Sequence, residues 1–203
     1  MMKEATANAD GDINTRIARR VRQLRAEAAL SLEALAQRCE VSRSMLSLIE
    51  RGESSPTAVV LEKIATGLGV TLASLFDAAS AVVSPLSRAE ERTSWRDPES
   101  GYWRTNISPP NFPAPLQIVE VVLPAGAHVA YDNGPRAADI HQQVWVQEGA
   151  LELTVGRVVH RLAQGDCLAM QLDAPTAFRN RTRKATRYIV VLGSERASAR
   201  RTP

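Results

Sequence analysis

Cysteine and long apolar runs are scarce in this chain, and each shortage excludes a class of protein. The two cysteines, Cys39 and Cys167, fall in separate predicted domains without CxxC spacing, so we interpret them as buried small apolar residues. This argues against a disulfide framework or a zinc site. No apolar run is long enough to cross a bilayer, and residues 1–12 lack the apolar core of a signal peptide. We therefore expect a cytoplasmic protein without a membrane partner.

The net charge and the chain length bear on nucleic-acid binding and on the number of domains. The formal net charge is only +3, so binding to nucleic acid would require the positive charges to be clustered. A chain of 203 residues exceeds the common size of a single domain, and two domains are expected. The pattern predicts a disordered tail (1–12), a helical domain (13–78), a linker with a possible outer strand (79–113), a β domain (114–194) and a C-terminal tail (195–203).

Residues 13–78 carry a helical period with clear capping signals. Apolar side chains recur at intervals of three and four, and Ser31, Ser42 and Thr71 precede three of these stretches as N-cap residues. The pattern predicts five short helices in an all-α domain. The apolar positions are Ile17, Val21, Leu24, Leu32, Leu35, Ala36, Met45, Leu46, Ile49, Val60, Leu61, Ile64 and Leu68.

The stretch from Ser31 to Gly52 has the spacing of a helix-turn-helix. One helix ends near Cys39, Glu40 and Val41 form a short turn, and Ser42 caps a second helix. The apolar stripe of that second helix leaves Arg43, Ser44 and Ser47 pointing outward. A short helix with small polar groups and an arginine near its N-terminus can reach base edges in the DNA major groove.

Beyond Pro115 the hydrophobic period switches from about four to two. Short alternating stretches separated by Gly, Pro and Asp turns predict a β-sandwich or a small barrel. The expected strands cover 117–123, 144–146, 151–155, 158–162, 167–172, 176–180 and 187–192. In the preceding linker, Trp95, Tyr102 and Trp103 argue against complete disorder, because clustered aromatic side chains usually pack on something.

Two segments of the sequence resemble known protein families. Residues 13–77 resemble the phage-repressor type of helix-turn-helix, the Xre class, through Ser31-Leu32-x-x-Leu35-Ala36, Val41-Ser42, Ile49-Glu50-Arg51-Gly52 and Leu68-Gly69-Val70. Residues 115–192 resemble a cupin, a double-stranded β-helix barrel, through Pro124-x-Gly126, the stretch 142–149, Gly165-Asp166 and Pro175-x-x-Phe178-x-Asn180. Together they imply a transcriptional regulator, not an enzyme, with a sensor barrel behind a DNA-binding head.

The first resemblance, together with the helix geometry, implies the residues that contact double-stranded operator DNA. Ser42 caps the recognition helix and meets a phosphate, Arg43 pairs with guanine, and Ser44 and Ser47 face bases or phosphates. Three further residues are expected to contact the DNA backbone: Ser31, Gln37 and Arg51. Arg51 has an alternative as a surface partner of Glu50 or Glu53. Glu50 is expected to be structural, accepting hydrogen bonds from a neighbouring helix or from Arg20.

The second resemblance implies a barrel without a metal. Gln142 stands where metal-binding cupins carry Glu, Thr176 stands at a frequent His position, and no residue of 135–138 is His. His141 has the opposite strand parity to Gln142 and is expected to point away. We therefore expect neither a metal nor another cofactor.

A metal-free barrel can still hold a small effector. By strand parity the expected pocket residues are Gln142, Val144, Val146, Thr176, Phe178 and Asn180. These side chains could equally fill the core. Three hypotheses remain open: a homodimeric regulator with an effector-binding cupin, a cupin metalloenzyme with a DNA-targeting head, and a regulator whose cupin only dimerises.

Overall fold

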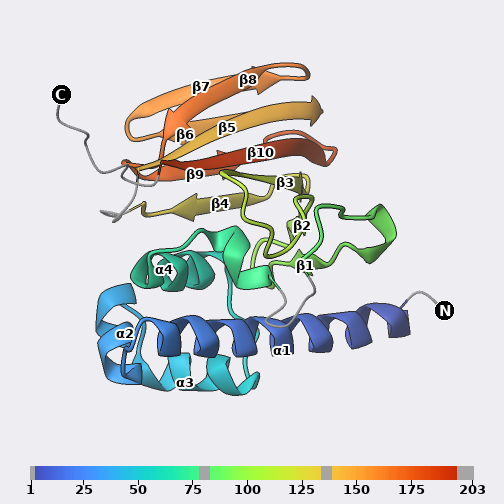
Figure 1. The fold of residues 1–203 in the computed structure, drawn as a ribbon. Helices are drawn as coiled ribbons and strands as arrows, with labels where there is room; N and C mark the ends of the chain where they lie inside the picture. The colour runs from blue at the N-terminus through green and yellow to red at the C-terminus, as the bar shows by residue number, and fades with distance from the viewer. Residues whose placement is uncertain (1–2, 78–82, 134–138, 196–203) are drawn as a thin grey trace.

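A long N-terminal helix begins the helical domain (Figure 1). The computed structural model describes residues 3–77, 83–133 and 139–195, with side chains from Ile13 onward. Helix α1 spans Lys3–Glu27, so it begins well before Ile13, where the sequence pattern placed its start after a disordered tail. Ile17 and Val21 are fully buried on its inner face. In the part of the chain with coordinates, no helix is both long and apolar enough to cross a membrane.

Three further α-helices begin and end at the residues that the capping signals indicate. They are α2 (Leu32–Cys39), α3 (Arg43–Arg51) and α4 (Ala58–Leu68), and each has a side-chain cap, from Ser31, Ser42 and Thr57 respectively. Gly52 ends α3 with φ of +73°, a left-handed conformation that favours glycine. The fifth expected helix, capped by Thr71, is a short 3-10 helix, η1 (Leu72–Phe76). The described part of the domain therefore has four α-helices, not five.

The β domain is made of two antiparallel sheets that face each other. The larger sheet has the order β1-β2-β3-β10-β5-β8 and the smaller β4-β9-β6-β7. These sheets stay separate and do not close into a single barrel. The strands are β1 (Ser94–Arg96), β2 (Trp103–Asn106), β3 (Leu116–Leu123), β4 (His128–Tyr131), β5 (Asp139–Glu148), β6 (Ala150–Val155), β7 (Val158–Ala163), β8 (Cys167–Gln171), β9 (Thr176–Arg179) and β10 (Thr186–Glu195).

The stretch expected to be a linker is folded over much of its length. It contributes a 3-10 turn, η2 (Ala89–Glu91), and the hairpin β1–β2, which joins the larger sheet beside β3. Trp95 is buried on this hairpin, with its ring 5.5 Å from that of Phe76 in the helical domain. Residues 78–82 and the tail beyond Glu195 lie outside the described residues.

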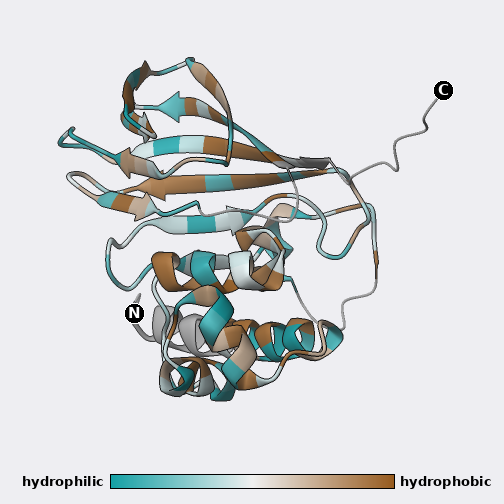
Figure 2. Ribbon diagram, turned by 90° about the vertical axis from the view of Figure 1, so that its left-hand side faces the viewer, coloured by the Kyte–Doolittle hydropathy of each residue, from teal (hydrophilic) through white to brown (hydrophobic). Residues whose placement is uncertain are grey.

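The helical domain packs directly against the β sheets, and we call this interface the seam. Helix α4 lies between the other helices and the sheets (Figure 1), and apolar segments occur on both sides of the seam (Figure 2). At Gly67 a Cβ atom would lie 2.9 Å from the Cβ of Cys39, so glycine allows α4 to pack closely on α2. Cys39 is buried as expected, whereas Cys167 is exposed, because it faces outward on β8, the edge strand of the larger sheet.

Candidate functional site

Helix α3 presents a polar outer face while its inner face is held in the core. Leu46 and Ile49 are almost completely buried. The Arg43 side chain is 69% exposed, with a loose contact of 3.7 Å to Glu33. Ser42 and Ser44 are also exposed, and their hydroxyl oxygens lie 3.1 Å apart. Met45, expected in the apolar stripe, is instead 38% exposed, because its side chain projects beside the core-facing row.

An ion pair between α1 and α3 fixes the orientation of this face. Nε and Nη2 of Arg25 donate to the two carboxylate oxygens of Glu50 at 2.6 and 2.8 Å. Arg22 of the same helix donates to the backbone carbonyl of Glu50. The structural role expected for Glu50 is therefore present, and its partner is Arg25 of the neighbouring helix α1, not Arg20. Arg20 turns the other way and donates to the carbonyl oxygen of Ser74.

The remaining residues of the predicted DNA surface divide into two kinds. Ser31 and Gln37 are exposed on the α2 side of the motif. Arg51 instead donates twice to Glu53, at 2.8 Å each, and also contacts the Ser47 hydroxyl. This hydrogen bond from Arg51 lowers the pKa of the Glu53 carboxyl. Contact of Arg51 with a phosphate would therefore have to compete with Glu53.

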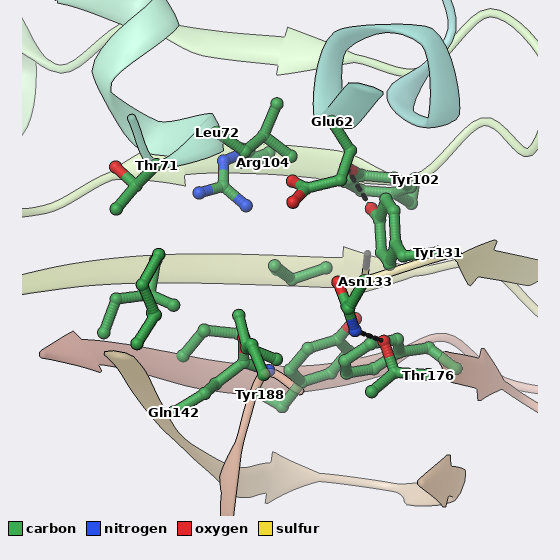
Figure 3. A pocket seen from close by; sticks show the side chains of 16 residues that line it. Glu62, Thr71, Leu72, Tyr102, Arg104, Tyr131, Asn133, Gln142, Thr176 and Tyr188 are labelled. Carbon is green, nitrogen blue, oxygen red and sulfur yellow. Dashed lines mark hydrogen bonds between the residues drawn. The ribbon is translucent and has the colours of Figure 1, made fainter. Parts of the chain in front are cut away.

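A small pocket lies at the seam, and both domains contribute to its wall (Figure 3). The cavity has a volume of about 60 Å³. Its helical side is formed by Glu62 of α4 together with Thr71 and Leu72. The β domain supplies Tyr102, Arg104, Val121, Tyr131, Asn133, Ile140, Gln142, Leu172, Thr176, Phe178, Tyr188, Val190 and Leu192.

Hydrogen bonds connect several polar groups of the pocket wall. The hydroxyl groups of Tyr102 and Tyr131 lie 3.0 Å apart, and the Asn133 amide donates to the Thr176 hydroxyl at 2.9 Å. Burial raises the pKa of Tyr102, Tyr131 and Tyr188. At neutral pH these phenols therefore keep their protons and can act as both donors and acceptors. A few hydrogen-bonding groups among apolar side chains are typical of a small-molecule site.

The structure brings half of the predicted pocket residues to the cavity. Gln142, Thr176 and Phe178 line it. Val144 and Val146 face inward as strand parity predicts, but they are fully buried in the core and are not among the lining residues.

Asn180 also misses the cavity, because its side chain is used by the backbone. It is fully buried, and its amide nitrogen donates to the carbonyl oxygens of Leu123, Pro124 and Lys184 at 2.8–3.0 Å. Its side-chain oxygen accepts hydrogen bonds from Thr182. Asn180 is therefore a structural residue that anchors the loop between β9 and β10.

Sequence reasoning did not identify the pocket residues that come from the helical domain and from the β1–β2 hairpin. Glu62 and Arg104 are both less than one-tenth exposed, although each carries a charge. The signal that could have found this wall is the aromatic cluster around Tyr102, which packs on the seam. Tyr131, for which a pocket mouth and a sheet edge were both open, lines the pocket. Trp145 is 49% exposed on the outer side of β5.

Metal-ligating side chains do not gather in the described residues. Over 3–77, 83–133 and 139–195 no group of three His, Cys, Asp or Glu residues is placed to hold a metal ion. His141 is exposed, on the opposite side of β5 from Gln142, as parity predicts. Residues 135–138, where a cupin metal site would carry His, lie outside the described residues, so the expected absence of a metal stays a prediction.

Polar contacts across the seam tie the β1–β2 hairpin to the helices. Asp97 is almost completely buried and accepts a hydrogen bond from the backbone N–H of Ala58 at 2.8 Å, at the N-terminus of α4. A carboxylate there is stabilised by the helix dipole. Asn106 donates to the carbonyl oxygen of Ala73, and Thr71 donates to Gln117. On the same seam, burial raises the pKa of Asp77 to about 6.

Comparison with known proteins agrees with this architecture. A family model described as a helix-turn-helix domain matches residues 16–77. The HTH-type transcriptional regulator SutR from Escherichia coli is 31% identical over 161 residues, which cover 79% of this chain and 84% of the relative.

Solved structures extend the similarity to both domains. The crystal structure of an HTH_3 family transcriptional regulator from Vibrio cholerae aligns with a TM-score of 0.74 at 28% identity, covering 92% of this chain and 99% of that one. A cupin domain of an XRE family transcriptional regulator from Enterobacter cloacae aligns with a TM-score of 0.41 at 19% identity, covering 47% of this chain and 98% of that one. The chain belongs to the HTH-type transcriptional regulators, with a DNA-binding helix-turn-helix domain followed by a C-terminal β domain.

Proposed function

We propose that α3 contacts operator bases through Arg43 and Ser44, and that a small effector in the seam pocket alters this binding. The composition of the pocket wall supports the proposal of an effector site. Glu62, Thr71 and Leu72 belong to the helical domain, and the other lining residues belong to the cupin. A molecule held there touches both domains. Its affinity can then differ between two arrangements of the seam, which is the requirement for coupling to DNA binding.

The DNA contacts also favour a dimer. Helix α3 has only nine residues, so one copy covers a short stretch of one major groove. Two copies related by a two-fold axis place their recognition helices in successive major grooves, about 34 Å apart. We propose that the functional unit is such a homodimer on a palindromic operator.

Replacing Arg43 with alanine is expected to weaken binding to the preferred duplex by about 10–100-fold. The reason is the loss of a bidentate contact to guanine, typically about 1–3 kcal/mol for each contact. The duplex is obtained by selection from random sequences, and affinity is measured by fluorescence anisotropy at fixed salt. Arg161→Ala is the matched control, because it removes the same charge from an 86% exposed side chain on β7. Equal losses in both variants would show that Arg43 contributes only charge.

Filling the pocket is expected to abolish the effector response. Val190 lines the cavity, and Val190→Phe would occupy much of its volume. Val191→Phe is the control, since the neighbouring residue on β10 faces the other side of the sheet. Melting temperature and operator affinity of the full chain are measured with a panel of small acids, amines, amides and sugars. We expect a compound that raises the melting temperature and changes operator affinity in the wild type and in Val191→Phe, but not in Val190→Phe. An equal response in all three proteins would contradict the proposed site.

The alternative in which the cupin is only a dimerisation module predicts a completely filled core. The pocket at the seam, with its polar wall, favours the sensor over that alternative. The full chain is needed for these measurements, because the isolated cupin would lack the pocket wall supplied by α4 and η1.

A further inference from the structure

The two sheets of the β domain present different outer faces. On the smaller sheet, Glu152 of β6 is the register partner of Arg161 on β7 and of Arg179 on β9. Leu151 and Leu153 beside Glu152 are buried, so this charged row points outward. Charged residues at outward positions are typical of a sheet face in contact with water. The larger sheet does not follow this pattern.

The outer face of the larger sheet carries large apolar side chains, and we call it the apolar face. On β10, Val190 is buried, so Ile189 and Val191 on either side of it point outward. Ile118 of β3 is the register partner of Val191, and Trp145 of β5 is the partner of Ile189. Ile118 is 37% exposed and Trp145 is 49% exposed. A contiguous apolar surface of this kind marks a site of interaction.

Polar side chains border the apolar face toward both ends of its strands. At one end Arg187 of β10 donates to Glu120 and Glu148 at 3.1 and 2.7 Å. At the other end His141 of β5 and Gln171 of β8 are register partners, and both are exposed. An apolar centre with a polar border is the usual anatomy of an interface between proteins.

A second copy of the chain is the partner that fits this face. Segments 78–82, 134–138 and 196–203 contain no apolar side chain larger than valine, so they are poor covers for it. Two copies related by a two-fold axis bring identical apolar faces together. Five strands about 4.8 Å apart, with four outward residues about 6.8 Å apart, give roughly 600 Å² on each copy. The pair would bury roughly 1,200 Å², which reaches the size of stable interfaces.

We infer that the chain dimerises through the apolar face, with the larger sheets of two copies packed against each other. The inference rests on the proposed homodimer and assigns its interface. In Figure 1 the larger sheet extends from β8, farthest from the helices, to β1 beside them. A two-fold axis that lies in the interface and follows this direction places both helical domains at the same end of the dimer. Both α3 helices can then contact one DNA duplex.

Sedimentation of the full chain without DNA, over a range of micromolar concentrations, tests the interface. We expect the wild type to be a dimer. Trp145→Glu and Ile118→Glu are expected to weaken dimerisation at least about a hundredfold, because each would bury an unpaired charge twice in a symmetric interface. Val159→Glu is the matched control, since Val159 is 53% exposed on β7 of the other sheet. This control is expected to remain a dimer.

Trp145→Ala provides a second measurement if the charged variants do not fold, which circular dichroism detects. It removes apolar area without adding a charge and is expected to weaken dimerisation about tenfold. Val191→Phe, the control of the effector experiment, leaves the face apolar and is expected to remain a dimer.

Two results would overturn the inference. Dimers of equal strength in the wild type, Trp145→Glu, Trp145→Ala and Ile118→Glu would show that the interface lies elsewhere, while the proposed homodimer stands. A wild type that stays monomeric throughout the range would also contradict it. The number of chains bound to the selected duplex then decides the proposed homodimer, because two chains per duplex retain it and one chain contradicts it.

Discussion

Replacing Glu50 with alanine is expected to lower the free energy of unfolding of the helical domain by about 2–4 kcal/mol. Glu50 is 6% exposed and receives both hydrogen bonds from Arg25, whose side chain is 21% exposed. Loss of the carboxylate leaves a largely buried guanidinium without its counter-charge. Because Arg25 retains some contact with water, the expected cost lies at or below the range known for fully buried pairs.

Urea unfolding of the full chain, followed by circular dichroism at the helical minimum, measures this effect. Glu53→Ala is the matched control, because Glu53 forms a similar two-bond pair with Arg51 but is exposed. That variant is expected to leave the midpoint unchanged, since exposed ion pairs contribute little. Equal and small effects in the two variants would show that the Arg25–Glu50 pair does not hold α1 against α3.

Replacing Asn180 with alanine is expected to destabilise the β domain by about 3 kcal/mol. The substitution removes the amide donor of the Leu123 and Pro124 carbonyl oxygens, and each buried unsatisfied group costs about 1–3 kcal/mol. The carbonyl oxygen of Lys184 keeps its hydrogen bond from the Thr182 hydroxyl. Partial compensation by water at the loop keeps the sum near the lower end. Tryptophan fluorescence follows this unfolding, because Trp95, Trp103 and Trp145 all lie in the β sheets.

The Asn180 variant also separates a structural residue from a pocket residue. Gln142→Ala is the control, because Gln142 lines the cavity and its loss should change ligand binding more than stability. If Asn180→Ala instead unfolds like the wild type and loses ligand binding, the earlier expectation that Asn180 lines the pocket would be restored.

The features that sequence predicted well are those encoded by neighbouring residues. Helix caps depend on hydrogen bonds across three positions, and Ser31, Ser42 and Thr71 accept hydrogen bonds from the expected N–H groups. Strand parity, which also depends on adjacent residues, correctly placed Gln142 inward and His141 outward.

Parity does not determine depth in the core or conformation beyond a strand end. Val144 and Val146 have the predicted orientation but lie away from the cavity. Asn180 follows the last residue of β9, where alternation no longer fixes the side-chain direction. These predicted pocket residues therefore lie away from the cavity for two different physical reasons.

The seam could not be derived from local patterns, because its contacts join segments far apart in the chain. Asp97 bonds to Ala58, and Arg104 shares a pocket with Glu62. Each of these charged residues looks like an ordinary surface residue in its own segment. They are buried where the β1–β2 hairpin packs on α1 and β4 packs on α4, and that packing depends on the tertiary fold.

Arg43 of α3 is proposed to contact a guanine in the major groove of the operator. Replacing single guanines of the selected duplex with 7-deazaguanine removes the N7 acceptor without changing base pairing. Affinity is measured for wild type and Arg43→Ala on both duplexes, which gives a double-mutant cycle across the interface. We predict one position in each half-site where 7-deazaguanine weakens the wild type but has no further effect on Arg43→Ala. Fully additive losses at every guanine would show that Arg43 does not contact a guanine N7 atom.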